Sequence, residues 1–189
     1  MKNKHWFSAY FVAVWATTAL LIACDSSTEN TSTETTPAVK EETGFSFGFS
    51  KGLKKDITTG LKTTNDGLSY EEVFLVNDRN EKLSSNEMAL QTSFSVVLTD
   101  VDGFTLKTGN AYPGIAIVVS DAEGLEIMNT GDLLAEYKNG VALQDAKTLT
   151  ASFTVGKPMQ TGKYHFKARF WDKNGKGEII SEIDLNVKG

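Results

Sequence analysis

Residues 161–187 read TGKYHFKARFWDKNGKGEIISEIDLNV, and apolar side chains alternate with polar ones along both halves of this stretch. The apolar or small members are Tyr164, Phe166, Ala168 and Phe170, followed by Ile179, Ser181, Ile183, Leu185 and Val187. Alternation with a period of two is typical of antiparallel strands with one buried face. Asp172-Lys173-Asn174-Gly175 separates the halves and has the residues of a tight turn. The stretch therefore predicts a β-hairpin that contributes one face to a hydrophobic core.

The same pattern continues through most of the chain. Alternating strands are predicted at residues 94–98, 115–119 and 149–155, with a shorter strand at 72–76 and a weaker one at 57–63. Asp78-Arg79-Asn80-Glu81 and Asp121-Ala122-Glu123-Gly124 separate successive strands as turns. One short helix is predicted from Asp132 to Tyr137, and a single helical turn at Asp145. The predicted class is all-β, an antiparallel β-sandwich.

A tyrosine just after a glycine turn narrows the architecture. Thr161-Gly162-Lys163-Tyr164-His165-Phe166 resembles the tyrosine corner of immunoglobulin-like and fibronectin-like sandwiches. The resemblance covers about residues 90–189 and implies that the phenol oxygen contacts the backbone preceding its own strand. The cysteines and the buried tryptophan of antibody domains are missing, and another β-sandwich or a jelly roll is the alternative. Residues 44–90 are expected to add strands to the same sheets, which gives a single domain over residues 44–189.

The N-terminus has the three parts of a secretory signal. Lys2 and Lys4 precede an uncharged apolar run from Trp6 to Ile22, and Ala23 precedes the only cysteine, Cys24. Leu21-Ile22-Ala23-Cys24 resembles the lipobox of bacterial lipoproteins. This resemblance implies a signal peptide over residues 1–23, cleavage before Cys24, and lipidation of the Cys24 sulfur. The alternatives are an uncut signal anchor that spans the membrane and a soluble secreted protein.

Residues 24–43 are expected to be a flexible tether between the lipid and the domain. They consist mostly of Ser, Thr, Glu and Asn, a composition that buries too little apolar surface to fold. The expected location is exported and membrane-anchored, at the outer membrane or cell surface rather than the inner membrane. Asp25, directly after Cys24, instead resembles the inner-membrane retention signal of enteric bacteria.

Composition argues against several classes of function. Removing residues 1–23 removes two lysines and no acidic residue, which leaves 17 basic and 24 acidic side chains and a net charge of −7. This balance argues against a nucleic-acid partner. His165 is the only histidine beyond residue 23, so neither a His-dependent nucleophile nor a zinc site is expected. We therefore expect no enzyme, no metal and no cofactor.

Two acidic loops offer oxygen ligands of the kind that calcium prefers. They are Asp100-Val101-Asp102-Gly103 and the segment from Asp172 to Glu178. Neither has the spacing of an EF-hand, and the second contains two lysines. Ordinary hairpin turns are the favoured interpretation.

The outward positions of the strongest strand form the candidate binding face: His165, Lys167, Arg169 and Trp171. An exposed tryptophan beside cationic side chains can stack on a sugar ring or anchor a protein partner. The alternative is that Trp171 covers the hairpin and the charges form an ordinary solvated face. The loops around Tyr112-Pro113 and Asn139-Gly140 are the second candidate surface.

These observations predict a non-catalytic, lipid-anchored protein of the cell envelope that binds or scaffolds a protein partner. The first alternative is an accessory lipoprotein that binds a glycan or another small ligand, and a hydrolase comes third. The surroundings of Trp171 discriminate among them. A groove beside an exposed Trp171 favours a glycan, a flat apolar patch favours a protein, and a buried Trp171 without a groove favours a structural role.

Overall fold

The computed structural model describes residues 51–189. The predicted signal peptide, Cys24 with its lipobox, the tether, and residues 44–50 of the predicted domain lie outside these residues. Within the described part, no helix has the length and apolar character needed to cross a bilayer.

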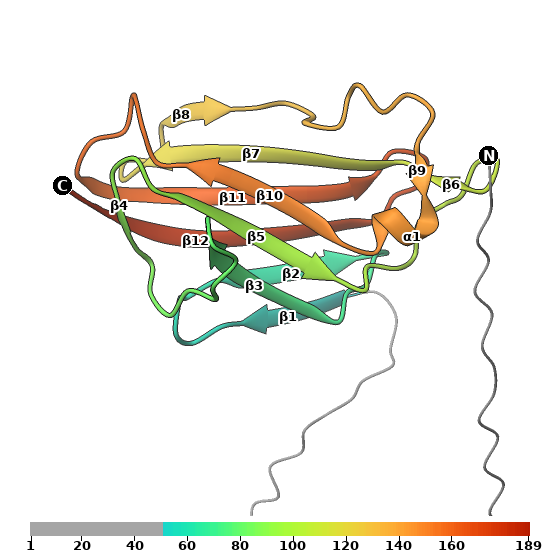
Figure 1. Ribbon diagram of the computed structural model, residues 1–189, viewed down its shortest axis with the longest axis horizontal. Coiled ribbons are helices and arrows are strands. Elements are labelled where there is room, and N and C mark those ends of the chain that lie inside the picture. The colour runs from blue at the N-terminus through green and yellow to red at the C-terminus, as the bar shows by residue number, and fades with distance from the viewer. Residues whose placement is uncertain (1–50) are drawn as a thin grey trace, which may run out of the picture. The chain divides into compact units, whose positions relative to one another are not determined.

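Seven strands form the larger of two stacked sheets (Figure 1). Its order from one edge to the other is β1 (Lys51–Lys55), β2 (Lys62–Asp66), β12 (Glu178–Lys188), β11 (Gly162–Asp172), β7 (Pro113–Asp121) and β8 (Glu126–Asn129). The seventh strand, β4 (Glu87–Ala89), pairs with the end of β12 and is the one strand of the described sheets that runs parallel to its neighbour. The long β11–β12 hairpin lies at the centre of this sheet, as residues 161–187 predict.

Three strands form the second sheet, in the order β10 (Leu149–Thr154), β5 (Ser93–Thr99) and β3 (Glu72–Asn77). A two-stranded ladder joins β6 (Asn110–Ala111) to β9 (Val141–Ala142), directly before the four-residue helix α1 (Leu143–Ala146). Because β1, β2 and β4 join the larger sheet and β3 joins the smaller one, residues before 90 contribute to both layers. The fold is the expected all-β, Ig-like antiparallel sandwich.

Three phenylalanines connect the two sheets. Phe94 of β5 and Phe153 of β10 meet Phe166 of β11, with ring centroids 5.0–5.8 Å apart, and the two pairs that include Phe94 meet edge to face. All three side chains are buried. Edge-to-face contact places the positive rim of one ring against the negative face of another, which adds to the gain from burying apolar surface.

The tyrosine corner is confirmed. The phenol oxygen of Tyr164 accepts a hydrogen bond from the backbone N–H of Gln160, at 2.9 Å. This contact joins the start of β11 to the loop before it, as the resemblance to immunoglobulin-like sandwiches implies.

The weak strand expected at residues 57–63 is displaced toward the C-terminus. The chain turns between Asp56 and Leu61, and β2 begins at Lys62. The Asp56 carboxylate accepts hydrogen bonds from Thr58 N at 2.9 Å and from Thr59 Oγ1 at 2.6 Å, and Gly60 has a φ of 79°. An Asx turn closed by a left-handed glycine therefore replaces the first half of the expected strand.

The helix expected from Asp132 to Tyr137 is a series of turns. Asp132 Oδ1 accepts the Leu134 N–H at 2.9 Å, as a helix cap does. Leu133, however, donates its N–H to Ile115 O of β7 at 2.7 Å, which holds the segment against the sheet edge. Near Asp145 the helical turn is present, but α1 begins at Leu143.

Candidate functional site

The β11 face consists of His165, Lys167, Arg169 and Trp171, and all four side chains lie on the outer side of the larger sheet. They alternate with Phe166, Ala168 and Phe170, which are buried against the smaller sheet. The strand parity predicted from the sequence is therefore confirmed. The register of β11 with β12 places Glu178, Glu182 and Asp184 beside this row.

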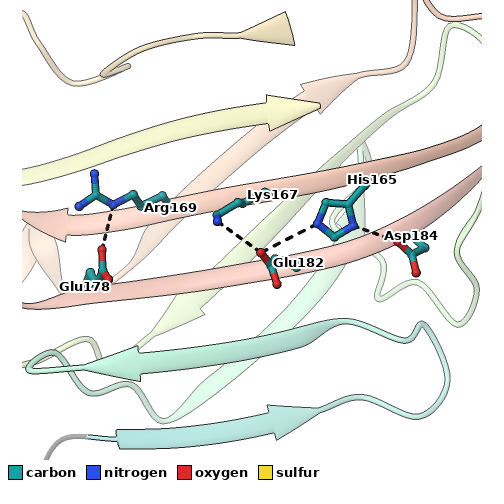
Figure 2. A network of polar contacts seen from close by, with 6 residues as sticks. All are labelled: His165, Lys167, Arg169, Glu178, Glu182 and Asp184. Atoms are coloured by element: carbon teal, nitrogen blue, oxygen red, sulfur yellow. Dashed lines mark hydrogen bonds and ion pairs between the residues drawn. The ribbon is translucent and has the colours of Figure 1, made fainter. Parts of the chain in front are cut away.

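His165, Lys167 and Arg169 of the β11 face each contact a carboxylate of β12, as Figure 2 shows. His165 Nδ1 lies 2.9 Å from Asp184 Oδ1, and Lys167 Nζ lies 3.4 Å from Glu182 Oε1. Arg169 Nε donates to Glu178 Oε2 at 2.9 Å. These pairs are largely solvent-exposed, so each contributes little to stability. Their main consequence is that the face presents little unbalanced charge to a ligand.

Trp171 is half-buried and lies over the neighbouring strand. It is opposite Gly114 of β7, and a Cβ at position 114 would lie 2.1 Å from an indole carbon. The Arg169 guanidinium lies over the same indole, 4.9 Å from its centroid. The indole therefore has cation–π and backbone contacts within the protein. Trp171 therefore packs onto the protein, as the alternative expected, but it covers β7 rather than the β11–β12 hairpin.

Two shallow grooves are present, and neither is lined by Trp171 itself, although Glu178, which lies opposite Trp171, lines the first. One, of about 390 Å³, lies on the outer side of β1, β2 and β12 and is lined by Leu53, Thr64 and Ile180 among others. The other, of about 780 Å³, is lined by residues 90–91 and 156–160. Neither groove includes a residue of the β11 face, so the combination expected for a glycan, a groove beside an exposed Trp171, is not found there.

The two candidate loops contact each other. Gly140 packs so closely on Tyr112 that a Cβ there would lie 2.9 Å from the ring, and 2.5 Å from Ala111 O. Asn110 Nδ2 also donates to Asn139 O at 3.0 Å. With the β11–β12 turn, these segments form what we call the loop end, residues 104–112, 132–142 and 172–177. It lies at the end of the sandwich marked by β6 and β9 in Figure 1.

A buried carboxylate connects two segments of the loop end. Asp172 is only 3% exposed, and its oxygens accept the N–H groups of Thr105 at 2.7 Å and Asn174 at 3.0 Å. Gly175 packs against the same carboxylate, where a Cβ would lie 2.3 Å from Oδ2. Burying this charge is compensated by charge-assisted hydrogen bonds. Asp172 is therefore a structural anchor of the expected hairpin turn.

Lys173 connects the third segment of the loop end, residues 132–142, to the other two segments. Its Nζ lies 2.6 Å from Asp132 Oδ2 and donates to Leu134 O at 2.8 Å, while its backbone N–H donates to Tyr112 O. Partial burial alone raises the pKa of Asp132, but hydrogen bonds from Lys173, Leu134 and Ile115 outweigh it and hold this pKa below its ordinary value. These contacts make the loop end a connected structure rather than a set of independent loops.

Large apolar side chains remain exposed on this connected structure. Tyr137 is 55% exposed, Leu133 is 47% exposed and Leu106 is 46% exposed. No sequence pattern selects these three residues, because loop residues carry no periodicity that separates exposed from buried positions. Leu133 and Tyr137 fall instead within the short helix expected from the sequence.

The carboxylates of both acidic loops accept backbone hydrogen bonds. Asp102 Oδ1 accepts the adjacent Gly103 N–H at 2.8 Å, and both Asp172 oxygens accept backbone N–H groups. Across residues 51–189, no three His, Cys, Asp or Glu side chains gather in a position to hold a metal ion.

Comparisons with known proteins identify no family. No family model matches the chain, and no curated protein matches it. Among solved structures it is similar to the C-terminal domain of wzt (TM-score 0.43, 9% identity, 65% of this chain and 74% of that one). It is also similar to a Niemann-Pick type C2 protein from Japanese carpenter ant (TM-score 0.40, 7% identity, 66% of this chain and 95% of that one). A third similar structure is a Jonesia denitrificans lytic polysaccharide monooxygenase (TM-score 0.32, 16% identity, 54% of this chain and 56% of that one). Because these TM-scores are below 0.5, the functional argument rests on the residues of this chain.

The close contact of Trp171 with Gly114 predicts that Gly114→Ala destabilises the domain. The added Cβ has no room beneath the indole, so we expect a loss of about 1–3 kcal/mol in the free energy of unfolding. Denaturant unfolding monitored by tryptophan fluorescence measures this loss. Gly156→Ala is the matched control, because nothing lies within 4 Å of the position that its added Cβ would take. Equal stability of the two variants would contradict the packing described.

The lowered pKa of Asp132 predicts a pH-dependent contribution to stability. A carboxyl group whose pKa is lowered by folding stabilises the folded state above its unfolded pKa, near 4, and loses this effect as pH falls through the folded value. Asp132→Asn should therefore lower the free energy of unfolding most at neutral pH, with a difference that shrinks below about pH 4.

Urea unfolding from pH 7 to pH 3 tests this expectation. In a Lys173→Met background the effect of Asp132→Asn should be smaller, because the cation that favours the charged form is gone. If the free energy of unfolding differed between wild type and Asp132→Asn by the same amount at every pH, this role of Asp132 would be contradicted.

Proposed function

We propose that the protein is a non-catalytic, lipid-anchored component of the bacterial cell envelope whose loop end binds a protein partner. The observation that carries this proposal is the set of exposed apolar side chains on the loop end, Leu106, Leu133 and Tyr137. Binding residues commonly lie on loops held by a rigid β-scaffold, and tyrosine is enriched at protein interfaces. Contacts from Asp172 and Lys173 hold these loops in place before binding, which lowers the entropy cost of association.

The β11 face supports this proposal less well than the loop end does. Lys167 and Arg169 are paired with carboxylates of β12. The indole of Trp171 packs against Gly114 and lies beneath the Arg169 guanidinium. A glycan that stacked on Trp171 would have to displace Arg169. Binding of a glycan by the β11 face is therefore the second proposal.

Anchoring is proposed from the lipobox alone. Lipidation of Cys24 adds acyl chains whose burial in a bilayer gives durable attachment. The domain would then be tethered to a membrane, at the outer membrane or cell surface, through the chain that precedes it.

Cys24→Ala should release the protein from the membrane fraction, since no sulfur remains to carry the lipid. Fractionation of cells followed by mass spectrometry of the N-terminal peptide measures both attachment and acylation. Recovery of an unmodified N-terminus from wild-type membranes would contradict lipid anchoring, whatever the domain binds.

Tyr137→Ala and Leu133→Ala should weaken capture of the partner. Each removes exposed apolar area from the loop end, and we expect the double variant to lose at least about tenfold in affinity, the effect of one interface hot spot. The measurement is cross-linking and affinity purification of the full chain from envelope fractions, with the tag at Gly189. The C-terminus lies at the other end of the sandwich from the loop end (Figure 1).

Leu125→Ala is the matched control, because Leu125 is 66% exposed but lies in the turn between β7 and β8. The partner is the protein whose recovery depends on Tyr137 and Leu133 and not on Leu125. Equal recovery by all variants would exclude the loop end, and recovery that depends on Trp171 would move the site to the β11 face.

A further inference from the structure

The edge of the smaller sheet at β10 carries unpaired backbone groups. The register of β10 with β5 continues to Val155, whose N–H donates to Thr92 O at 2.9 Å. Because alternate residues of an antiparallel strand bond to the same side, the backbone N–H and C=O groups of Leu149, Ala151 and Phe153 point toward β5. The N–H and C=O groups of Thr150, Ser152 and Thr154 therefore point away from the sheet. All three residues are exposed, and among residues 51–189 β10 pairs with no strand other than β5.

The other edges of the two sheets are protected. A returning segment bonds to β3, with Leu83 N donating to Leu75 O and Asn77 N donating to Glu81 O. The β7–β8 pairing is irregular between Val119 and Ser120, and β1 ends in Lys54 and Lys55. Bulges, lysines and covering segments are the usual means of blocking an edge. In contrast, β10 reads LTASFT and contains neither a charge nor a proline.

The two sheets also differ in width on this side. In Figure 1, which looks through both layers, β8 lies beyond β7 and farther out than β10. Met128 of β8 is opposite Val119 of β7, whose side chain is fully buried, so Met128 faces the same inner side. Met128 itself is only half-buried. The inner face of β8 therefore has apolar surface where a fourth strand of the smaller sheet would lie.

We infer that β10 is the docking edge for an extended segment of another protein, which adds a fourth strand beside it and covers Met128. Main-chain hydrogen bonds to Thr150, Ser152 and Thr154 would hold the segment, as in other strand additions. Its apolar side chains would alternate, with one row packed over β8 and polar side chains on the outer face. Lys147 and Lys157, just beyond the two ends of β10, favour acidic residues at its flanks.

A second copy of this chain fits the edge less well than a single strand does. Its β8 would project past its own β10 in the same way. The two projecting strands would meet before the β10 edges reached the spacing of about 4.8 Å within a sheet. This site is separate from the loop end, so either can fail without the other.

The test uses amide hydrogen exchange followed residue by residue by NMR on the full chain in detergent micelles. The probe is a capped synthetic peptide in which three valines alternate with three threonines, with two glutamates at each end. Thr150, Ser152 and Thr154 should exchange rapidly in the free protein and become protected on addition of peptide. Their neighbours Ala151 and Phe153, bonded to β5, should be protected in both states.

Two variants at one position separate main-chain from side-chain binding. Ser152→Pro removes an N–H that points away from β5, a position where an edge strand tolerates proline, and should weaken peptide binding at least about tenfold. Ser152→Val removes the hydroxyl but keeps the N–H, and should bind within about twofold of wild type. If Ser152→Pro does not fold, Met128→Glu tests the same site by placing a charge beneath the added strand.

Absence of protection at millimolar peptide would overturn the inference, as would equal binding by Ser152→Pro and Ser152→Val. A dimer that is lost in Ser152→Pro would overturn it in favour of a second copy as the occupant. Tyr137→Ala should leave peptide binding unchanged.

Discussion

The contact of Phe94 and Phe153 with Phe166 is the interaction on which the rest of the structure depends. It joins the smaller sheet to the strand at the centre of the larger one. The described residues contain no cysteine, so the two layers are held by packing without a disulfide. Because β11 is fixed from inside by Phe166, its outer residues and the turn at Asp172 are fixed as well. The β11 face and the loop end therefore both take their positions from this core.

The strands could be predicted because a period of two is a local property of the sequence. Phe94, Ile117, Phe153 and Ile183 all point inward as their parity requires. Even Ser181 follows this rule, since its buried hydroxyl lies 2.9 Å from Thr63 Oγ1 of β2. The rule failed where local hydrogen bonds compete with it. The Asp56 turn replaces half of one expected strand, and turns with three-residue hydrogen bonds, such as Ala135 N to Asp132 O, replace the expected helix.

The candidate site was less predictable because it depends on pairing between distant residues. Parity placed His165, Lys167 and Arg169 outside, but it did not show that the hairpin register supplies a carboxylate beside each of them. The loop end depends on contacts such as Asp172 with Thr105 and Gly140 with Tyr112, which no local pattern reveals. The sequence predicts Tyr112 and Asn139 as members of a binding surface, whereas only the exposed fractions of Tyr137, Leu133 and Leu106 single out these three residues.

The unequal width of the two sheets bears on how a tethered domain can engage a partner. A sandwich whose layers match in width has its inner faces fully covered, but here the smaller sheet stops at β10 while the larger one continues to β8. At the opposite edge of the smaller sheet, Leu83 and its neighbours fold back and form hydrogen bonds with β3. On the β10 side no described segment does so, although an open edge invites unwanted pairing. The sequence blocks the remaining edges but leaves this one uncharged, which is the pattern expected where strand addition has a use.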